Sequence, residues 1–245
     1  MADTILALQG VAKSFGGLTV IDDVGFQVRR GSRTALIGPN GAGKTTVFNL
    51  IGGVYPVDRG TVRMEGEDIT TLPARLRIGR GIARSFQNVR LMPHLSTVEN
   101  VMLGEHWRSS PLALARGKRA ARAAEAALAD AGLATYPGQV VATLPYGIQK
   151  RIEVVRALAA EPRLLLLDEP AAGLNTAETA ELRLLLERAS ARGITLLVVE
   201  HDMQFVRRLC DNVIVLNFGR MIFAGTPDEA HRHPGVREAY LGVAA

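Results

Sequence analysis

The segment at residues 38–45 constrains this 245-residue chain more than any other part of its sequence. It reads Gly-Pro-Asn-Gly-Ala-Gly-Lys-Thr and fits the pattern G-x-x-x-x-G-K-[ST] at every position. Glycines let backbone N–H groups curl around phosphate oxygens without a clash from a Cβ atom. Lys44 can neutralise the β- and γ-phosphates of a nucleotide, and the Thr45 hydroxyl can ligate Mg²⁺. The segment therefore predicts a binding loop for a nucleoside triphosphate with its magnesium ion.

The residues on either side of this phosphate loop agree with that prediction. Residues 34–37 form a short apolar run that predicts a strand, and residues 45–51 have apolar side chains at helical spacing. A helix that begins at the loop directs the positive end of its dipole toward the phosphates. We therefore expect the loop and the first helical residues to bind the nucleotide: Gly38, Pro39, Asn40, Gly41, Ala42, Gly43, Lys44, Thr45 and Thr46.

Asp168 and Glu169 supply the second half of a hydrolytic site. They follow the four leucines at residues 164–167, a continuous apolar run that is typical of a strand buried on both faces. Such a strand carries the residues after it to the carboxyl edge of the sheet, where the phosphate loop also lies. Asp168 can hold Mg²⁺ through water, and Glu169 can accept a proton from the attacking water. The chain contains neither an Asn-Lys-x-Asp segment, which would indicate a guanine nucleotide, nor the dinucleotide pattern G-x-G-x-x-G.

The rest of the chain alternates between strand and helix patterns. Short strands are expected at residues 5–8, 24–28, 194–199, 213–216 and 220–224, with a hairpin at residues 60–69. Helices are expected at residues 112–131, 178–191 and 203–209. The predicted fold class is α/β: a P-loop NTPase core with an antiparallel β portion and an inserted helical subdomain. The chain is interpreted as one domain, with its core at about residues 1–89 and 161–245 and its helical subdomain at about residues 90–160.

An Asp-Glu pair after an apolar strand, far downstream of the phosphate loop, resembles the ATP-binding cassette (ABC) ATPases. Three further residues follow this family's order along the chain. Gln87, in Ser85-Phe86-Gln87-Asn88, lies where the family has its Q-loop glutamine, which senses Mg²⁺ and contacts membrane partners. His201 follows a buried strand like the family's switch histidine at the γ-phosphate, and Phe15 resembles the aromatic residue that stacks on adenine.

The resemblance implies a complete set of site residues, with ATP and Mg²⁺ as the cofactors. The catalytic residues would be Glu169, His201 and Lys44. The ATP-binding residues would be those of the phosphate loop together with Phe15 and Gln87. The metal ligands would be Thr45, Gln87 and Asp168, the last of them through water.

Residues 144–149 align with the family's signature, Leu-Ser-Gly-Gly-Gln, which in one subunit completes the nucleotide site of the other. The aligned residues are Leu144, Pro145, Tyr146, Gly147, Ile148 and Gln149. Pro145 replaces the serine and removes a hydroxyl and an amide donor, while Tyr146 and Ile148 replace a glycine and the glutamine. Asn175 stands where the family's D-loop (residues 170–175 here) usually ends in aspartate, and it is expected at a dimer interface. These departures leave open the alternative of a non-hydrolytic partner subunit.

Several of the departures together resemble one subgroup, the ATP-binding subunits of branched-chain amino acid importers. They are the Tyr-Gly signature, Glu-Pro-Ala-Ala-Gly-Leu-Asn at residues 169–175, Glu-His-Asp-Met at residues 200–203, and the ending at residues 233–242. The subgroup implies a second ABC ATPase subunit, identical or different, with transmembrane permease subunits and a separate solute-binding protein. It places the chain peripherally on the cytoplasmic face of the cell membrane. Importers of urea, amides or aromatic acids have similar ATPases and remain an alternative.

The formal net charge of +5 and the sequence pI of about 9.8 raise the question of an anionic partner. A soluble ABC ATPase acting on DNA or ribosomes is one alternative, but such proteins usually have two cassettes or long coiled-coil insertions. The chain has one phosphate loop and no long heptad run, so no nucleic-acid partner is expected. The basic residues Arg116, Lys118, Arg119 and Arg122 lie in the predicted helical insertion, where they form either a solvated face or a contact with a membrane subunit or anionic lipid.

Overall fold

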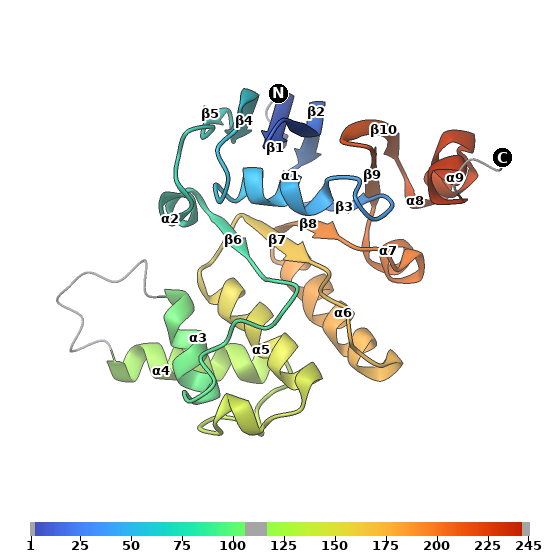
Figure 1. Cartoon of the computed structure of the whole chain (residues 1–245). Coiled ribbons are helices and arrows are strands. Elements are labelled where there is room, and N and C mark those ends of the chain that lie inside the picture. Colours follow the sequence, from blue (N-terminus) through green and yellow to red (C-terminus); the bar gives the residue numbers. More distant parts are fainter. Residues whose placement is uncertain (1–2, 106–116, 242–245) are drawn as a thin grey trace.

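A six-stranded sheet positions most of the predicted site residues in this computed structural model, which describes residues 3–105 and 117–241 (Figure 1). The strand order is β10 (Arg220–Gly225), β9 (Asn212–Asn217), β3 (Arg33–Ile37), β8 (Thr195–Val199), β7 (Leu164–Asp168) and β6 (Ile82–Arg84). From β9 to β6 the strands are parallel, and β10 pairs antiparallel with β9. Because parallel strands end at the same edge, the segments that follow β3, β6, β7 and β8 come together there.

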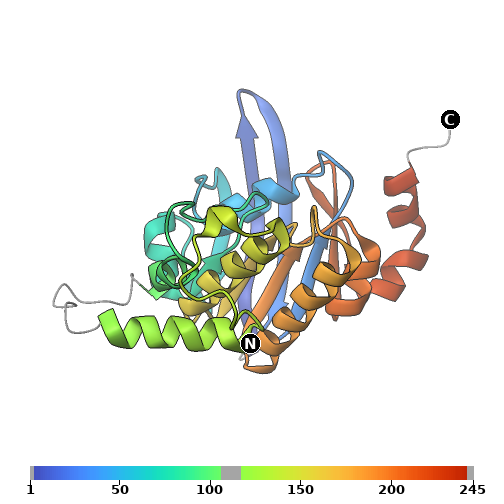
Figure 2. The same ribbon diagram turned by 90° about the horizontal axis from the view of Figure 1, so that it is seen from below.

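The N-terminal third forms a second, antiparallel sheet, as predicted. Its order is β2 (Leu18–Arg29), β1 (Thr4–Phe15), β4 (Arg59–Met64) and β5 (Glu67–Asp68). β1 and β2 are longer than the strands expected at residues 5–8 and 24–28. Gly10 has a positive φ of 59°, and the pairing register shifts between Leu8 and Val11. Such bulges interrupt the apolar–polar alternation without ending the strand. Figure 2 shows the β1–β2 hairpin projecting beyond the rest of the molecule.

The hydrophobic core lies on both faces of the parallel sheet. Helix α1 (Lys44–Ile51) packs with the antiparallel sheet on one face, where Leu164 and Leu166 of β7 are buried. Leu165 and Leu167 are buried on the opposite face, with residues from helices α5, α6 and α7. The prediction of a strand buried on both faces is therefore confirmed for β7.

The helices between β6 and β8 lie on the side of the parallel sheet opposite β1 and β2 (Figure 1). They are α3 (Thr97–Glu105), α4 (Gly117–Asp130), α5 (Tyr146–Ala159) and α6 (Thr176–Ala191). The helix predicted at residues 112–131 corresponds to α4, and residues 112–116, with Arg116, lie outside the described part of the chain. Short elements complete this region: α2 (Ala74–Arg77) and the 3₁₀ turns η1 (Ile78–Arg80) and η4 (Val141–Thr143).

The C-terminal part contains α7 (Met203–Leu209), α8 (Pro227–Arg232) and α9 (Pro234–Leu241). Asp202 begins α7, because its side chain accepts hydrogen bonds from the N–H groups of Gln204 and Phe205. The adjacent residue His201 is thereby fixed between the end of β8 and the start of α7. Across residues 3–105 and 117–241, none of the helices combines the length and the apolar character that crossing a membrane requires.

Candidate active site

The phosphate loop follows β3 and passes directly into α1. Gly38, Gly41 and Gly43 all have positive φ angles, of 150°, 81° and 98°. A Cβ atom on Gly38 would lie 2.2 Å from the carbonyl oxygen of Leu216, and one on Gly43 would lie 2.5 Å from Cδ1 of Ile21. These positions therefore require glycine for space as well as for backbone conformation. A Cβ on Gly41 would meet nothing within 4 Å, so the loop is open to a ligand there.

Lys44 is buried within this loop, with 8% of its surface exposed. Its Nζ donates hydrogen bonds to the carbonyl oxygens of Gly38 (2.7 Å) and Pro39 (3.0 Å). Burial lowers the pKa of Lys44, while the negative charges of Glu169 and Asp168 act to raise it. The ammonium group therefore lies between the loop that would hold phosphates and the two carboxylates that follow β7. Thr45 is exposed and Thr46 is half-buried in the first turn of α1.

Glu169 is the point at which three separate segments meet. Its backbone N–H donates to the carbonyl oxygen of Val199 (2.9 Å), and its φ of 44° lies in the left-handed region. A non-glycine residue in that region stores strain of about 1–3 kcal/mol, which is typical of active sites. Oε2 of Glu169 accepts a hydrogen bond from Nε2 of Gln87 (2.9 Å) and lies 3.8 Å from Nδ1 of His201. The structure thus brings together Gln87, Glu169 and His201, as the sequence predicted.

Asp168 has a cationic partner that sequence reasoning missed. Nη2 of Arg84 donates to Oδ2 of Asp168 (2.6 Å), and Nη1 donates to Oδ1 of Asn49 in α1 (2.6 Å). Both side chains of the ion pair are largely buried, with 12% of Arg84 and 7% of Asp168 exposed. The Arg84 guanidinium also lies over the ring of Phe86 at 5.2 Å. An arginine three residues before Gln87, next to apolar Ile82 and Ala83, was the available sequence signal.

Glu200 is a second buried acid that sequence reasoning missed. It is 1% exposed at the end of β8, where Oε1 accepts from the N–H of Ala171 (2.9 Å) and Oε2 accepts from the N–H of His201 (3.1 Å). Burial raises the pKa of Glu200, and these backbone hydrogen bonds act to lower it. Its carboxylate therefore joins the D-loop after β7 to the histidine after β8.

Comparison with known proteins agrees with this geometry. Residues 21–172, which include the phosphate loop, Gln87, the signature and both carboxylates, match the family model described as ABC transporter. The chain belongs to the ABC transporter family. It is thus an ATP-binding cassette, and it is an ATPase.

The chain is similar over its whole length to curated members of the family. It is 38% identical to the high-affinity branched-chain amino acid transport ATP-binding protein BraF of Pseudomonas aeruginosa, with 100% of both chains covered. It is 36% identical to the corresponding protein LivG of Salmonella typhimurium, again with complete coverage. A crystal structure of the ADP conformation of an ATP-binding cassette superposes with a TM-score of 0.88, at 30% identity and with 98% and 99% of the two chains covered.

The cassette's signature packs against the D-loop of its own chain. Pro145 is the N-cap residue and Tyr146 the first residue of α5, so the signature lies at the start of this helix. A Cβ on Gly173 would lie 3.1 Å from Cε1 of Tyr146, and one on Gly147 would lie 2.4 Å from Oε1 of Glu178. The Tyr146 ring therefore fills space beside the D-loop. Elsewhere in the signature, Leu144 is buried, Ile148 is half-buried, and Nε2 of Gln149 donates to the Leu144 carbonyl oxygen (2.8 Å).

Asn175, at the end of the cassette's D-loop, is exposed and has a local partner. Its side chain accepts a hydrogen bond from the N–H of Glu178 (3.0 Å), and Oε2 of Glu178 accepts from the N–H of Asn175 (3.0 Å). This reciprocal pair is a capping box that begins α6. The same Glu178 side chain lies against Gly147, so the cap of α6 and the signature are in direct contact.

Phe15 lies at the surface of the cassette, with 40% of its area exposed at the end of β1. The edge of its ring meets Tyr55, with the ring centroids 5.1 Å apart and the ring planes at 74°. Nζ of Lys13 lies 5.3 Å from the centre of the same ring. Phe15 is therefore not a core residue, which keeps it available for stacking on a base, and Tyr55 is an aromatic neighbour that sequence reasoning did not select.

Proposed function

We propose that this chain is the ATP-hydrolysing subunit of an importer of branched-chain amino acids. The observation that carries the proposal is the full-length similarity to BraF, whose name states that activity. The sequence features of the subgroup at residues 144–149, 169–175 and 200–203 agree with it. ATPases for urea, amides or aromatic acids are the alternative that the same features leave open.

The residues at the sheet edge fit an ATP molecule and a magnesium ion. The loop's glycines and the first turn of α1 direct N–H groups toward a phosphate position, and Lys44 adds a positive charge. Thr45, Gln87 and Asp168 offer the hydroxyl, amide and carboxylate oxygens that Mg²⁺ prefers, with Asp168 acting through water. The metal, when bound, neutralises charge that develops on the transferred phosphoryl group. Phe15 is proposed to stack on the adenine.

In the proposed reaction, Glu169 accepts a proton from the water that attacks the γ-phosphorus. As the new P–O bond forms, the bond from the γ-phosphorus to the β,γ-bridging oxygen breaks, and ADP and inorganic phosphate are released. Lys44 stabilises the charge on the phosphates, and His201 stabilises charge at the γ-phosphoryl group. The contact of Glu169 with Gln87 and its proximity to His201 support these roles, since each group is near the carboxylate that takes the proton.

The proposed second subunit would meet the signature, Leu144 to Gln149. These residues begin α5, so the positive end of that helix dipole can be directed at a phosphate of the partner's ATP. Gly147 is buried beside Glu178, where a Cβ atom would lie only 2.4 Å from Oε1. In this proposal each cassette uses its own phosphate loop, Asp168 and Glu169 and borrows the signature of the other.

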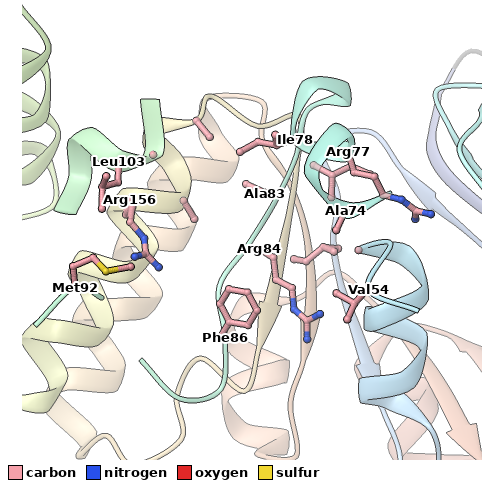
Figure 3. Close-up of a pocket in the computed structure, with 16 residues that line it drawn as sticks. Val54, Ala74, Arg77, Ile78, Ala83, Arg84, Phe86, Met92, Leu103 and Arg156 are labelled. Carbon is pink, nitrogen blue, oxygen red and sulfur yellow. The ribbon is translucent and has the colours of Figure 1, made fainter. Parts of the chain in front are cut away.

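A cavity of about 410 Å³, lined in part by Phe86 next to Gln87, supports a permease partner (Figure 3). Apolar side chains line it, among them Phe86, Met92 and Leu103. Arg84 and Arg156 are also in its lining and come from opposite walls, the end of β6 and α5. We propose that it receives an apolar permease segment, because most of its lining is apolar and both arginines are already engaged within the chain, Arg84 by Asp168 and Arg156 by the carbonyl oxygen of Arg90. A peripheral position on the cytoplasmic face of the membrane, and a separate solute-binding protein, belong to this proposal.

The division into a core at about residues 1–89 and 161–245 and a helical subdomain at about residues 90–160 is also part of the proposal. Contacts among α3, α4 and α5 support it, since these helices pack on one another. Hydrolysis would then move one subdomain relative to the other and act on the permease segment between them.

The test of this function is uptake of radiolabelled solutes by cells that lack the chain. We expect loss of leucine uptake, restored by the wild-type chain and not by Lys44→Met. Arg80→Met, at an exposed cation with no proposed functional role, is the control and should restore uptake. Normal leucine uptake, with loss of urea or aromatic-acid uptake instead, would contradict the solute assignment and leave the ATPase assignment intact.

A further inference from the structure

Side chains of α5 hold the segment that leaves the parallel sheet after β6. Ser85 continues the β6–β7 ladder, with its N–H donating to the carbonyl oxygen of Leu166 (2.9 Å). Residues 86–90 then run outside any helix or strand toward α3. Lys150, Glu153 and Arg156 of α5 all bind backbone groups of this segment. Because they are three residues apart, they lie along one face of the helix.

Lys150 makes the contact nearest the ATP site. It is 1% exposed, and its Nζ donates hydrogen bonds to the carbonyl oxygens of Phe86 (2.9 Å) and Gln87. Burial lowers the pKa of Lys150, whereas the charge of Glu153 acts to raise it. A buried ammonium group is tolerated only where its donors are bound, so these two carbonyl groups and Lys150 depend on each other.

Glu153 and Arg156 hold the far end of the same segment. Oε1 of Glu153, which is 1% exposed, accepts from the N–H of Arg90 (2.9 Å). Nη1 of Arg156 donates to the carbonyl oxygen of Arg90 (2.7 Å), and Nη2 lies 3.7 Å from Oε1 of Glu153. Both backbone polar groups of Arg90 are therefore bound by α5, and the segment follows that helix at both ends.

Gln87 connects this arrangement to the proposed reaction. Its carbonyl oxygen accepts from Lys150, and its side-chain Nε2 donates to Oε2 of Glu169. Helix α5 begins at Tyr146, so the signature forms the first turn of the helix that holds Lys150. The surface proposed to meet the partner's ATP and the carboxylate proposed to act on the chain's own ATP are thus joined through Lys150 and Gln87.

We propose that Lys150 is a positioning residue of the ATPase: it holds the Gln87 side chain against Glu169 and couples that carboxylate to the signature helix. The proposal rests on the roles proposed above for Gln87 and Glu169. It gives a function to a buried lysine that the phosphate chemistry does not use. A shift of α5 on meeting a second subunit would move Gln87 relative to Glu169 through this link.

The test compares Lys150→Met with Arg151→Met in the full chain, purified with the subunits that accompany it. Arg151 is the matched control because it is the next residue of α5 and equally a buried cation. It pairs instead with Glu181 and the carbonyl oxygen of Ala131. We expect Lys150→Met to lower kcat about tenfold or more with the KM for ATP within about threefold, because ATP binding depends on the phosphate loop. Lys150→Arg, which keeps charge and donors, should recover most of kcat, and Arg151→Met should stay near the wild type.

Amide hydrogen exchange of the nucleotide-free protein gives a second readout. Residues 86–90 should exchange faster in Lys150→Met and at the wild-type rate in Arg151→Met. Lys150→Gln, which keeps one donor group, replaces Lys150→Met if the latter does not fold. Equal losses of kcat in the Lys150 and Arg151 variants, or unchanged kcat and exchange in the Lys150 variants, would overturn the proposal.

A double-mutant cycle separates this proposal from the function on which it rests. If Lys150 acts through Glu169, Lys150→Met should lower the residual hydrolysis of Glu169→Gln by less than about twofold. A full, additive loss in that background would contradict the link. If Glu169→Gln alone leaves turnover unchanged, the proposed base is wrong, while the exchange experiment still decides whether Lys150 holds residues 86–90.

Discussion

The phosphate loop and the residues proposed to face a partner differ in how closely they match the family pattern. At residues 38–45 the family pattern is met at every position, and the backbone itself needs glycine at Gly38 and Gly43. The signature and D-loop depart from the family pattern at Pro145, Tyr146 and Asn175, yet Tyr146 packs against Gly173 and Asn175 caps α6 within the same chain. The groups proposed to bind phosphate thus keep the family pattern together with the backbone geometry that it needs. The groups proposed to face a partner depart from that pattern, while Tyr146 and Asn175 make contacts within the chain.

The largest effect is expected in the phosphate loop, as a loss of ATP affinity. Lys44→Met removes a charge that is held by the Gly38 and Pro39 carbonyl groups and faces two carboxylates. ATP affinity should fall about tenfold to a hundredfold, the loss expected for one or two charge-assisted hydrogen bonds. Equilibrium binding of a fluorescent ATP analogue measures it. Affinity within about twofold of the wild type would show that Lys44 does not face the phosphates.

Breaking the Arg84–Asp168 ion pair tests how strongly the same edge is held in place. Arg84→Met leaves Asp168 buried without its cation, so the free energy of unfolding should fall by about 3–5 kcal/mol. The matched control is Arg80→Met, which removes an exposed pair with Glu67 and should cost less than about 1 kcal/mol. Urea denaturation of the three proteins gives both values. Equal losses would mean that burial of the pair contributes nothing.

A smaller loss is expected when the signature is returned to the family pattern. Tyr146→Gly empties the space beside Gly173 and adds a flexible residue to the start of α5, so the free energy of unfolding should fall by about 1–2 kcal/mol. Tyr146→Phe keeps the ring and should change it by less than about 0.5 kcal/mol. If Tyr146→Gly is as stable as the wild type, the signature and D-loop are not a matched pair. Thermal unfolding in the absence of nucleotide is the measurement.

The smallest effect is expected for Glu200, whose carboxylate connects the D-loop to His201. Burial raises its pKa in the folded chain, so the folded state binds a proton more tightly than the unfolded state. Stability from this group is therefore greatest below its ordinary pKa of about 4.5 and is lost as the pH rises toward the folded pKa. In Glu200→Gln this loss of stability should disappear. The free energy of unfolding, measured at several pH values above about 4.5, should therefore depend less on pH than in the wild type. An unchanged pH profile would contradict this.

The fold was predictable where burial follows the local sequence. β3, β7 and β8 each contain a run of three or four consecutive apolar residues because both faces of the sheet are covered, and all three strands were predicted. β6 was missed, since it has only three residues and ends in Arg84, whose burial depends on Asp168 far along the chain. β1 and β2 were predicted too short because bulges break their alternation.

The site residues also fall into those that the sequence predicted and those that only tertiary contacts explain. Lys44 and Glu169 were predicted from the chemistry of their motifs, and Gln87 and His201 from their resemblance to the order of the ABC family; the structure brings them together. Arg84, Lys150 and Glu200 were missed because each is explained by a tertiary contact: a buried carboxylate, two carbonyl groups and two N–H groups. A lone charge in a sequence window does not reveal such partners.

The most direct test of the account is steady-state phosphate release by Glu169→Gln, with ATP binding measured on the same sample. Glu169 has a φ in the left-handed region and contacts Gln87, and it is the proposed acceptor of the proton from water. Release should fall by about a hundredfold or more while the affinity for ATP is retained. Glu125→Gln, an exposed carboxylate on α4, should behave as the wild type. Undiminished release by Glu169→Gln would contradict the central claim that this carboxylate accepts the proton.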